Sequence, residues 1–365
     1  MDKKILTVIV PSYNMEAYLA KGLQSLIVDD KDLFQKLEVI VVNDGSKDHT
    51  SEIAHGFARE FPGIFHVIDK SNGHYGSCIN AALPEAQGEY VKVLDADDSV
   101  DTKSFCNFCR AVLEEVEKGD DGADLLVSPY QTIMTNGELK ATVDYGLLER
   151  KTYYTLDEYP VSSPRFTIHS ITYRTDFIRK MGYRQTEGMC YTDTEWIIEP
   201  MTKVRRFRYF KEVVTYYRLG RDGQSMDPVI FGRDFQCVAD ITVGLVMRYG
   251  RLVGQCEATA KRYYRRRVED MVRKIYRGWA VGFCGCTCKV NIEEFDRRIK
   301  GIADFYEKAT DLYIGLNRYH YYFVRDFRKW HFRYTPKWLM YKLAMLMAKP
   351  YSIILAAMRK VAGRG

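Results

Sequence analysis

The tetrapeptide Asp95-Ala96-Asp97-Asp98 places three carboxylates within four residues. Carboxylates this close together repel each other unless a cation or several hydrogen-bond donors compensate their charge. In an extended chain Asp95 and Asp97 project to the same side. That arrangement suits a divalent metal, Mn²⁺ or Mg²⁺, that bridges protein carboxylates and a substrate phosphate. The alternative is an acidic turn that caps the helix expected after Ser99.

Two further polar segments could bind a ligand, and each follows an apolar run. Pro11-Ser12-Tyr13-Asn14 comes after Ile5–Val10, and Asn43-Asp44-Gly45-Ser46 comes after Glu38–Val42. Such short apolar runs, rich in β-branched residues and stopped by Pro or by turn residues, are typical of buried strands. Three strand ends therefore carry polar clusters, which favours the metal interpretation of Asp95 to Asp98 over the helix cap.

Strands and helices alternate through the first half of the chain. Further strands are expected at 64–68, 90–94 and 123–128, and helices at 16–28, from about 47 to 61, at 75–85 and at 104–117. Strands that alternate with helices of this length indicate right-handed crossovers and a mainly parallel sheet in an α/β fold. Ligands of such sheets bind outside the carboxyl ends of the strands, where the three polar clusters lie.

The charge is distributed unevenly along the chain, whose net charge is +6. Residues 201–365 contain 34 Lys and Arg and 15 Asp and Glu, a balance of +19, so residues 1–200 have a balance of −13. We therefore expect a catalytic domain at 1–228 and a basic, helical C-terminal region at 229–365. The residues Tyr264, Val268, Val272, Ile275 and Trp279 recur at helical spacing in that region.

Residues 318–365 are basic and rich in aromatic and apolar side chains, but Lys342, Lys349 and Pro350 interrupt their apolar stretch. This pattern favours helices that lie on an anionic membrane surface over a membrane-spanning helix. The alternative is a solvated helical subdomain. The first residues, Met1-Asp2-Lys3-Lys4, lack the pattern of a secretory signal, and nine scattered cysteines suit reduced thiols. We therefore expect a cytoplasmic protein, peripheral on the inner face of the cell membrane.

Together these motifs resemble glycosyltransferase family 2, whose members have the nucleotide-sugar-binding GT-A fold. The resemblance spans about residues 5 to 226 and rests on the order of six segments. These are Val8 to Asn14, Val41 to Ser46, Asn72-Gly73 through Asn80, Asp95 to Asp98, Thr192-Asp193 in place of the usual Glu-Asp, and Arg218 to Ser225.

The resemblance implies roles for individual residues of the donor site. Pro11, Tyr13 and Asp44 would line the base and ribose pocket, and Asn72 and Gly73 would close over the nucleotide. Asp97 would ligate the metal, and Asp95 would lie near the ribose or the metal-bound phosphate. Arg218 and Arg221 would approach the donor phosphates, where a guanidinium fork suits phosphate geometry. For these two arginines, a surface turn is the alternative.

On the acceptor side, the resemblance implies that Asp193 is the general base that deprotonates the acceptor hydroxyl. Thr192 and Glu195 also have the spacing of a capping box, in which Asp193 would only complement a helix dipole. Thr167, His169 and Ser170 lie in a stretch that shapes acceptor pockets in this family. The Gln-x-x-Arg-Trp motif of processive members is missing, so we expect a non-processive, inverting enzyme.

The sequence therefore predicts a metal-dependent glycosyltransferase that moves a sugar from a nucleotide-sugar, with UDP expected from the resemblance. The acceptor would be a glycan or a lipid-linked molecule in surface-polysaccharide or cell-wall synthesis. One alternative is a nucleotidyltransferase with a similar carboxylate site at its strand ends. The other is a nucleic-acid-binding protein that uses the basic half, but it leaves the acidic strand ends unexplained, so we expect no nucleic-acid partner.

Overall fold

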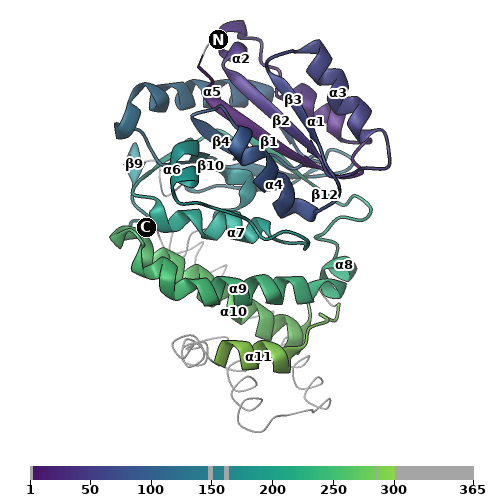
Figure 1. The fold of residues 1–365 in the computed structure, drawn as a ribbon, viewed down its shortest axis with the longest axis vertical. Coiled ribbons are helices and arrows are strands. Elements are labelled where there is room, and N and C mark those ends of the chain that lie inside the picture. The colour runs from purple at the N-terminus through teal and green to yellow at the C-terminus, as the bar shows by residue number, and fades with distance from the viewer. Residues whose placement is uncertain (1–2, 147–150, 160–163, 285, 301–365) are drawn as a thin grey trace, which may run out of the picture. The chain divides into compact units, whose positions relative to one another are not determined.

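The computed structural model describes residues 3–146, 151–159, 164–284 and 286–300 (Figure 1). The chain divides into two compact units. The first contains the residues up to Gln224 together with Tyr249–Arg267, and the second contains Ser225–Arg248 and continues from Val268. The predicted boundary at residue 228 stays a prediction, and residues 318–365 lie outside the described part.

The first unit is built on an eight-stranded sheet with the order β3-β2-β1-β4-β10-β6-β11-β9. The four strands β3, β2, β1 and β4 pair in parallel, as alternating strands and helices predict. β10 runs antiparallel to both of its neighbours. The strands are β1 (Leu6–Ser12), β2 (Leu37–Asn43), β3 (Phe65–Asp69), β4 (Tyr90–Val93), β6 (Leu125–Val127), β9 (Tyr153–Tyr154), β10 (Ile171–Arg174) and β11 (Phe207–Tyr209).

Helices cover both faces of this sheet. Figure 1 shows α4 (His74–Glu85) and α6 (Thr175–Lys180) in front of the strands. Alternate strand residues such as Leu6, Val8 and Val10 pack in one buried cluster with apolar side chains of the remaining helices. These helices are α1 (Leu19–Ser25), α2 (Lys31–Gln35), α3 (Thr50–Glu60) and α5 (Thr102–Glu117). The helix predicted over 16–28 is observed as the shorter α1, and α2 follows it as a second short helix.

The structure contains a second, smaller sheet that the sequence did not predict, and its strand β5 directly follows the acidic tetrapeptide. Its order is β5-β12-β7-β8, formed by β5 (Ser99–Val100), β12 (Thr215–Leu219), β7 (Tyr130–Met134) and β8 (Leu139–Val143). β5 and β12 are antiparallel, with Thr215 opposite Val100. This pairing brings the chain around Arg218 next to the loop that ends at Asp98.

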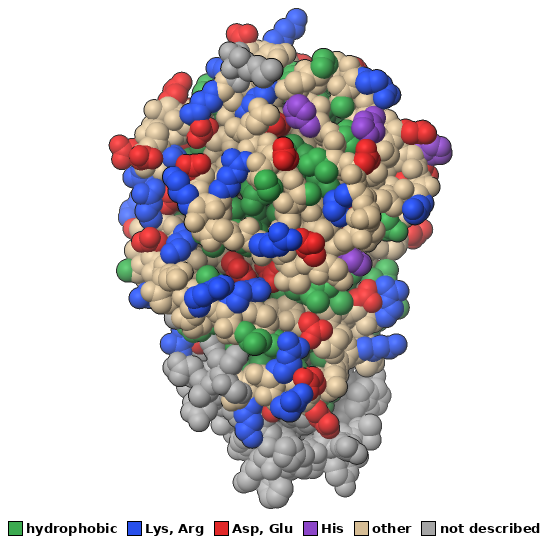
Figure 2. Space-filling view, viewed as in Figure 1, with side chains coloured by type: hydrophobic (Ala, Val, Ile, Leu, Met, Phe, Trp, Pro, Cys, Tyr) green, Lys and Arg blue, Asp and Glu red, His purple; other side chains and the backbone are tan. Residues whose placement is uncertain are grey.

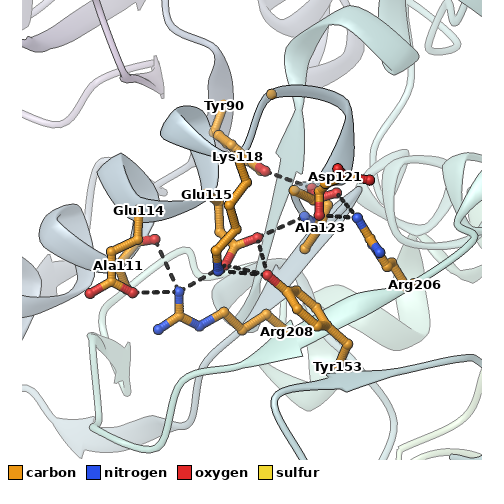
Figure 3. Close-up of polar contacts among 12 residues, drawn as sticks. Tyr90, Ala111, Glu114, Glu115, Lys118, Asp121, Ala123, Tyr153, Arg206 and Arg208 are labelled. Atoms are coloured by element: carbon orange, nitrogen blue, oxygen red, sulfur yellow. Dashed lines mark hydrogen bonds and ion pairs between the residues drawn. The ribbon is translucent and has the colours of Figure 1, made fainter.

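A buried carboxylate joins α5 to the far end of the main sheet (Figure 3). The Glu115 side chain is fully buried and accepts hydrogen bonds from Lys118 Nζ, the Ala123 amide and Arg208 Nη1, each at 2.8 Å. The Tyr153 hydroxyl donates at 3.0 Å. Burial acts to raise the pKa of Glu115, but these donors outweigh it and lower the pKa. The charged form of Glu115 is therefore part of the folded unit.

The second unit is helical, which confirms the predicted character of the C-terminal region for the described residues. Its segments come from α8 (Pro228–Arg233), α9 (Phe235–Gly254), α10 (Lys261–Val281) and α11 (Ile292–Lys300); parts of α9 and α10 belong to the first unit. Gly278 allows close packing, because a Cβ atom there would lie 2.3 Å from the Phe235 ring. Tyr276 and Phe295 join α10 to α11 with ring centroids 5.5 Å apart.

None of the described helices is both long enough and apolar enough to cross a bilayer. On the face that Figure 2 shows, Lys and Arg side chains are interspersed with Asp and Glu side chains. Although the sequence is acidic in its first half and basic in its second, neither sign of charge predominates among the described residues on this face.

Candidate active site

The three polar strand ends meet at one edge of the main sheet. β1 lies between β2 and β4 and is parallel to both, and Ser12 at the end of β1 is opposite Asn43 at the end of β2. The Asn14 amide donates to Ser46 Oγ at 3.0 Å and ties these two loops together. Pro11 is buried in β1, whereas the Tyr13 side chain is exposed beyond it. The carboxyl edge therefore carries a preformed group of loops, as the sequence predicts.

Asp44 is the buried carboxylate of this loop group. Its Oδ1 atom accepts hydrogen bonds from Lys70 Nζ at 2.6 Å and from the Gly73 amide at 3.0 Å. Lys70 Nζ also donates to Ser77 Oγ at 2.8 Å. Sequence reasoning missed Lys70, since a single Lys after a strand gives no signal of its own. The segment around Asn72-Gly73 is thus fixed to Asp44 through the Gly73 amide and through the Lys70 side chain.

The Asp-Gly-Ser turn requires a glycine. Gly45 has φ of +75°, and a Cβ atom there would lie 3.0 Å from the Asn72 amide nitrogen. A side chain at this position would meet both a strained backbone and the neighbouring segment. Gly45 therefore lets the loops after β2 and β3 approach each other around Asp44.

The acidic tetrapeptide forms a turn rather than an extended segment. The Asp98 amide donates to the Asp95 carbonyl at 2.9 Å, so the expectation that Asp95 and Asp97 project to one side from extended chain is wrong. The helix-cap alternative is also wrong, because the residue that caps α5 is Asp101, which accepts from the Ser104 amide at 2.9 Å. Asp95, Asp97 and Asp98 therefore do not cap α5, and their side chains can make other contacts at the edge of the sheet.

Each of the three acidic residues has its own partners. Asp95 Oδ1 accepts from the Tyr75 hydroxyl at 2.8 Å. Asp97 is paired with the Arg221 guanidinium. Asp98 has no exposed side-chain surface, and its Oδ1 accepts from the Arg218 amide at 2.8 Å. Asp97 is thus held by a side chain, whereas Asp98 is held by the backbone of β12.

Arg218 and Arg221 both contact the acidic turn. Arg218 lies in β12, is 6% exposed, and donates from Nε to the Asp97 carbonyl at 3.0 Å. The surface-turn alternative is therefore wrong for Arg218. The turn that follows, with positive φ at Gly220 and Gly223, holds Arg221 against Asp97. The structure brings both predicted arginines to the predicted metal loop.

Burial and mutual repulsion change the protonation of the acidic turn. Burial, followed by the charge of Asp98, raises the pKa of Asp95 to about 7. Burial, followed by the charge of Asp97, raises the pKa of Asp98 well above its ordinary value. Nearby Lys92 is buried in β4, and burial lowers its pKa to about 8. The described side chains compensate the negative charge of Asp95, Asp97 and Asp98 only in part, and a cation at this turn would compensate the rest.

The residues at the turn fit a divalent cation. One ligand atom each of Asp95, Asp98 and His169 lie within 4.8 Å of one another. Asp98 Oδ2 is enclosed, and among the described residues its close polar neighbour is His169 Nδ1, at 3.2 Å. Carboxylate oxygens and an imidazole nitrogen are suitable metal donors. Two buried carboxylates in one turn are costly when both are charged, so a cation at the turn would stabilise them.

His169 is the member of the predicted acceptor stretch that reaches the acidic turn. Its Nδ1 atom lies 3.2 Å from Asp98 Oδ2, and its ring stacks on Tyr217 with centroids 4.1 Å apart. Burial is the largest cause of a lowered pKa of His169. Ser170 is buried, and its hydroxyl donates to the Thr167 carbonyl at 2.8 Å. Thr167 and Ser170 thus close a turn that holds His169.

Asp193 is the first residue of α7 (Asp193–Ile198). The capping box predicted there is not formed. The Thr192 hydroxyl accepts from Gln185 Nε2 at 3.0 Å, and the Glu195 carboxylate accepts from the Thr186 amide at 2.7 Å. The competing contacts with residues 185 and 186 win because that segment runs directly beside the start of α7.

Asp193 belongs to the same electrostatic cluster as the acidic turn. Burial, then the charge of Asp95, then that of Asp193 raise the pKa of Tyr75 well above its ordinary value. Asp193 also contributes, after burial and other acidic residues, to the raised pKa of Tyr217. The predicted base and the predicted metal loop, about a hundred residues apart in sequence, therefore lie within electrostatic reach of the same two tyrosines.

Sequence reasoning missed three polar groups of this site besides Lys70. Asp98 was counted in the tetrapeptide without a role of its own. Lys92 could have been found, because a lysine inside an apolar strand is unusual and needs a buried partner. Tyr75 gave no signal, since one tyrosine at the start of a helix is ordinary.

Comparison with known proteins agrees with this geometry. The family model described as Glycosyl transferase family 2 matches residues 7–198. An uncharacterized glycosyltransferase of Mycoplasma pneumoniae, the MG025 homolog, is 28% identical over 61% of this chain and 70% of its own length. The minor teichoic acid biosynthesis protein GgaB of Bacillus subtilis is 32% identical over 34% of this chain and 13% of its own length.

A solved structure shares the fold. Residues 1–349 of Staphylococcus aureus TarS, in complex with UDP-GlcNAc, align with a TM-score of 0.63 and 20% identity over 88% of this chain and 87% of that one. The likeness supports the GT-A fold. Several curated relatives are matched over less than two thirds of their own length.

Proposed function

The chain belongs to glycosyltransferase family 2, and we propose that it moves one sugar from a UDP-sugar to a hydroxyl of a glycan or lipid-linked acceptor, with inversion at the anomeric carbon. Membership of the family identifies the chain as a glycosyltransferase. The nucleotidyltransferase and nucleic-acid-binding interpretations are therefore dropped. The observation that supports the finer proposal is that Asp95 of the acidic turn and Asp193 both act electrostatically on the same side chain, Tyr75.

The donor would bind along the three strand ends. Asp44 would accept a hydrogen bond from the base, with Pro11 and Tyr13 beside it. Asn72 and Gly73 would close over the nucleotide, because the Gly73 amide is already fixed to Asp44. Arg218 and Arg221 would face the diphosphate. Arg221 would then exchange its contact with Asp97 for one with phosphate, a bidentate partner that suits guanidinium equally well.

A divalent metal, Mn²⁺ or Mg²⁺, would be held by Asp95 and Asp97. When bound, it would neutralise the charge that develops on the leaving diphosphate. Tyr75 would orient Asp95 through its hydroxyl. The turn between Asp95 and Asp98 fixes the spacing of the two ligands.

Asp193 would take the proton from the acceptor hydroxyl while the hydroxyl oxygen attacks the anomeric carbon. The bond between that carbon and the diphosphate oxygen breaks, and its electron pair leaves with UDP. A single displacement from the opposite face inverts the anomeric configuration. Asp193 at the start of a helix is a rigid mount for a base. Thr167, His169 and Ser170 would line the acceptor side.

The acceptor class and the location of the protein rest on the relatives and on the basic tail. One relative is named for teichoic acid synthesis, which supports a role in cell-wall or surface-polysaccharide synthesis. The basic and aromatic residues 318–365 support peripheral binding at the inner face of the cell membrane, next to a lipid-linked acceptor. The division into a catalytic domain at 1–228 and a C-terminal region at 229–365 belongs to the same proposal.

A thermal-shift screen of UDP-, GDP- and dTDP-sugars, each with Mn²⁺ and with EDTA, tests the donor. We expect UDP-sugars with Mn²⁺ to raise the melting temperature most, since only ligands of the folded state stabilise it. A larger shift with GDP- or dTDP-sugars would reject UDP. For the tail, binding of the full chain to vesicles should rise with anionic lipid and fall with salt. Indifference to anionic vesicles at low salt would reject the membrane role.

A further inference from the structure

We propose that His169 is a ligand of the divalent metal through Nε2 and that Asp98 is the positioning residue that holds it there. The inference deepens the proposed function and rests on it, because it concerns the metal of the same site. It goes beyond the acidic turn, since it adds a nitrogen donor from a segment about seventy residues further along the chain.

The contact between His169 and Asp98 leaves one ring nitrogen for another partner. Nδ1 lies 3.2 Å from Asp98 Oδ2, so it is the nitrogen that faces the buried carboxylate. Histidines that ligate metals usually donate their other ring N–H to a carboxylate or carbonyl, which fixes both tautomer and ring orientation. With Nδ1 directed at Asp98, Nε2 is the ligand atom that His169 can offer.

The ring of His169 is held from several sides. It stacks on Tyr217 with an interplanar angle of 23°, and the Tyr130 ring lies 5.2 Å away, centroid to centroid. The His169 carbonyl accepts hydrogen bonds from Lys92 Nζ at 2.9 Å and from Thr215 Oγ1 at 3.0 Å. A ligand fixed in this way loses little freedom when the ion binds.

His169 lies beside Asp95, the ligand expected from the acidic turn. One ligand atom each of Asp95, Asp98 and His169 lie within 4.8 Å of one another, slightly more than the distance of about 4.2 Å that can separate two donors of one metal, so an ion would draw the donors of Asp95 and His169 together. Asp98 itself is a poorer ligand than Asp95, because its side chain has no exposed surface and its Oδ1 already accepts from the Arg218 amide. We therefore assign Asp98 to the second layer of the site, behind His169.

A nitrogen ligand has a consequence for metal choice. Mg²⁺ prefers oxygen donors in an octahedral shell, whereas transition metals bind imidazole more readily, in the order Mn²⁺, Fe²⁺, Co²⁺. The site should therefore prefer Mn²⁺ to Mg²⁺ and bind Co²⁺ more tightly than Mn²⁺. The preference should depend on His169.

The test is Mn²⁺ binding to the full chain, followed by electron paramagnetic resonance with detection of ¹⁴N coupling. We expect the wild type to bind Mn²⁺ with ¹⁴N coupling that disappears on ¹⁵N-histidine labelling. His169→Gln should bind Mn²⁺ at least about tenfold more weakly, without the coupling and with a reduced preference for Mn²⁺ over Mg²⁺. Asp98→Asn should keep the coupling but weaken affinity about 10- to 100-fold.

His66→Gln is the matched control, because His66 lies half-exposed in β3 with its Nε2 atom 3.8 Å from Glu38; it should leave Mn²⁺ binding unchanged. Wild-type protein that binds Mn²⁺ without ¹⁴N coupling would overturn the role of His169 and leave the proposed function standing. Coupling that survives in His169→Gln would do the same. Wild-type protein that binds no Mn²⁺, with or without UDP, would overturn both. The wild-type spectrum decides even if His169→Gln does not fold.

Discussion

Gly76 of α4 lies directly against the carbonyl oxygen of Thr186, and a Cβ atom at Gly76 would be 1.9 Å from it. Asn80, one turn further along the helix, exchanges two hydrogen bonds with the Gln185 backbone, at 2.8 and 2.9 Å. The helix that follows Asn72-Gly73 is thereby packed against the segment that leads to Asp193. In the proposed function this contact would join the donor side of the site to the acceptor side.

Gly76→Ala should therefore destabilise the protein by about 1–3 kcal/mol, because the added methyl group overpacks the contact. It should also reduce turnover by displacing the segment before Asp193. Gly56→Ala is the control: a Cβ atom at Gly56 in α3 would have open space around it, so alanine should stabilise the protein by about 0.5–1 kcal/mol. Chemical denaturation measures both. Equal effects of the two substitutions would refute the close contact.

Asp193→Asn should reduce turnover by roughly 10²- to 10⁴-fold, because the amide cannot accept the proton of the acceptor hydroxyl. Donor affinity should barely change, since the base acts on the acceptor. Asp176→Asn removes another carboxylate from the first turn of a helix, α6, where it forms an exposed pair with Lys180, and should leave turnover intact. Steady-state kinetics decide, and near-normal turnover of Asp193→Asn would reduce Asp193 to a helix-dipole residue.

Lys70→Met should weaken UDP binding by tenfold or more and lower the melting temperature. Without the ammonium group, the buried Asp44 carboxylate loses its charged donor at 2.6 Å, a loss of about 1–3 kcal/mol. Lys47→Met removes a neighbouring charge whose side chain is exposed and should have little effect. Calorimetric titration of UDP measures the affinities. Unchanged affinity in Lys70→Met would show that Asp44 holds its orientation without Lys70.

Glu115→Gln should destabilise the fold by about 3 kcal/mol or more, because Arg208 and Lys118 lose a buried carboxylate (Figure 3). Glu114 is 58% exposed and pairs with the same Arg208 atom at 2.8 Å. Glu114→Gln on the same helix should therefore cost less than about 1 kcal/mol. Similar losses for the two variants would contradict the special role of the buried carboxylate.

The same carboxylate gives a pH dependence. Its pKa is lowered in the folded state from an ordinary value of 4.5, so its contribution is fully present above about pH 4.5 and is lost as the pH falls through the folded pKa. The free energy of unfolding should therefore fall with pH in acid, and less steeply in Glu115→Gln. Parallel pH curves for wild type and variant would contradict this assignment.

The alternation of apolar strands and helices was enough to predict the parallel half of the sheet and its ligand-binding edge. β10 was missed because an antiparallel strand inserted between β4 and β6 depends on a long-range pairing, not on a local pattern. The small sheet with β12 was missed for the same reason, and with it the burial of Arg218.

At the site, residue types predicted the acidic cluster at the strand end, the Asp44 turn and the start of α7 at Asp193, but not that the acidic cluster folds as a turn. Side-chain competition was not predictable: Thr192 and Glu195 have the spacing of a capping box, yet residues 185 and 186 take both side chains. The approach of His169 to Asp98 was equally hidden, because it is set by the packing of Tyr217 and by Lys92 beneath the loop.

Metal-dependent binding of UDP at the acidic turn can be measured by calorimetric titration of UDP into the full chain. We expect saturable binding with Mn²⁺, loss of binding with EDTA, and loss of the Mn²⁺ dependence in Asp97→Ala while the folded state is retained. Undiminished Mn²⁺-dependent binding of UDP to Asp97→Ala, or equal binding to the wild type with EDTA, would contradict it.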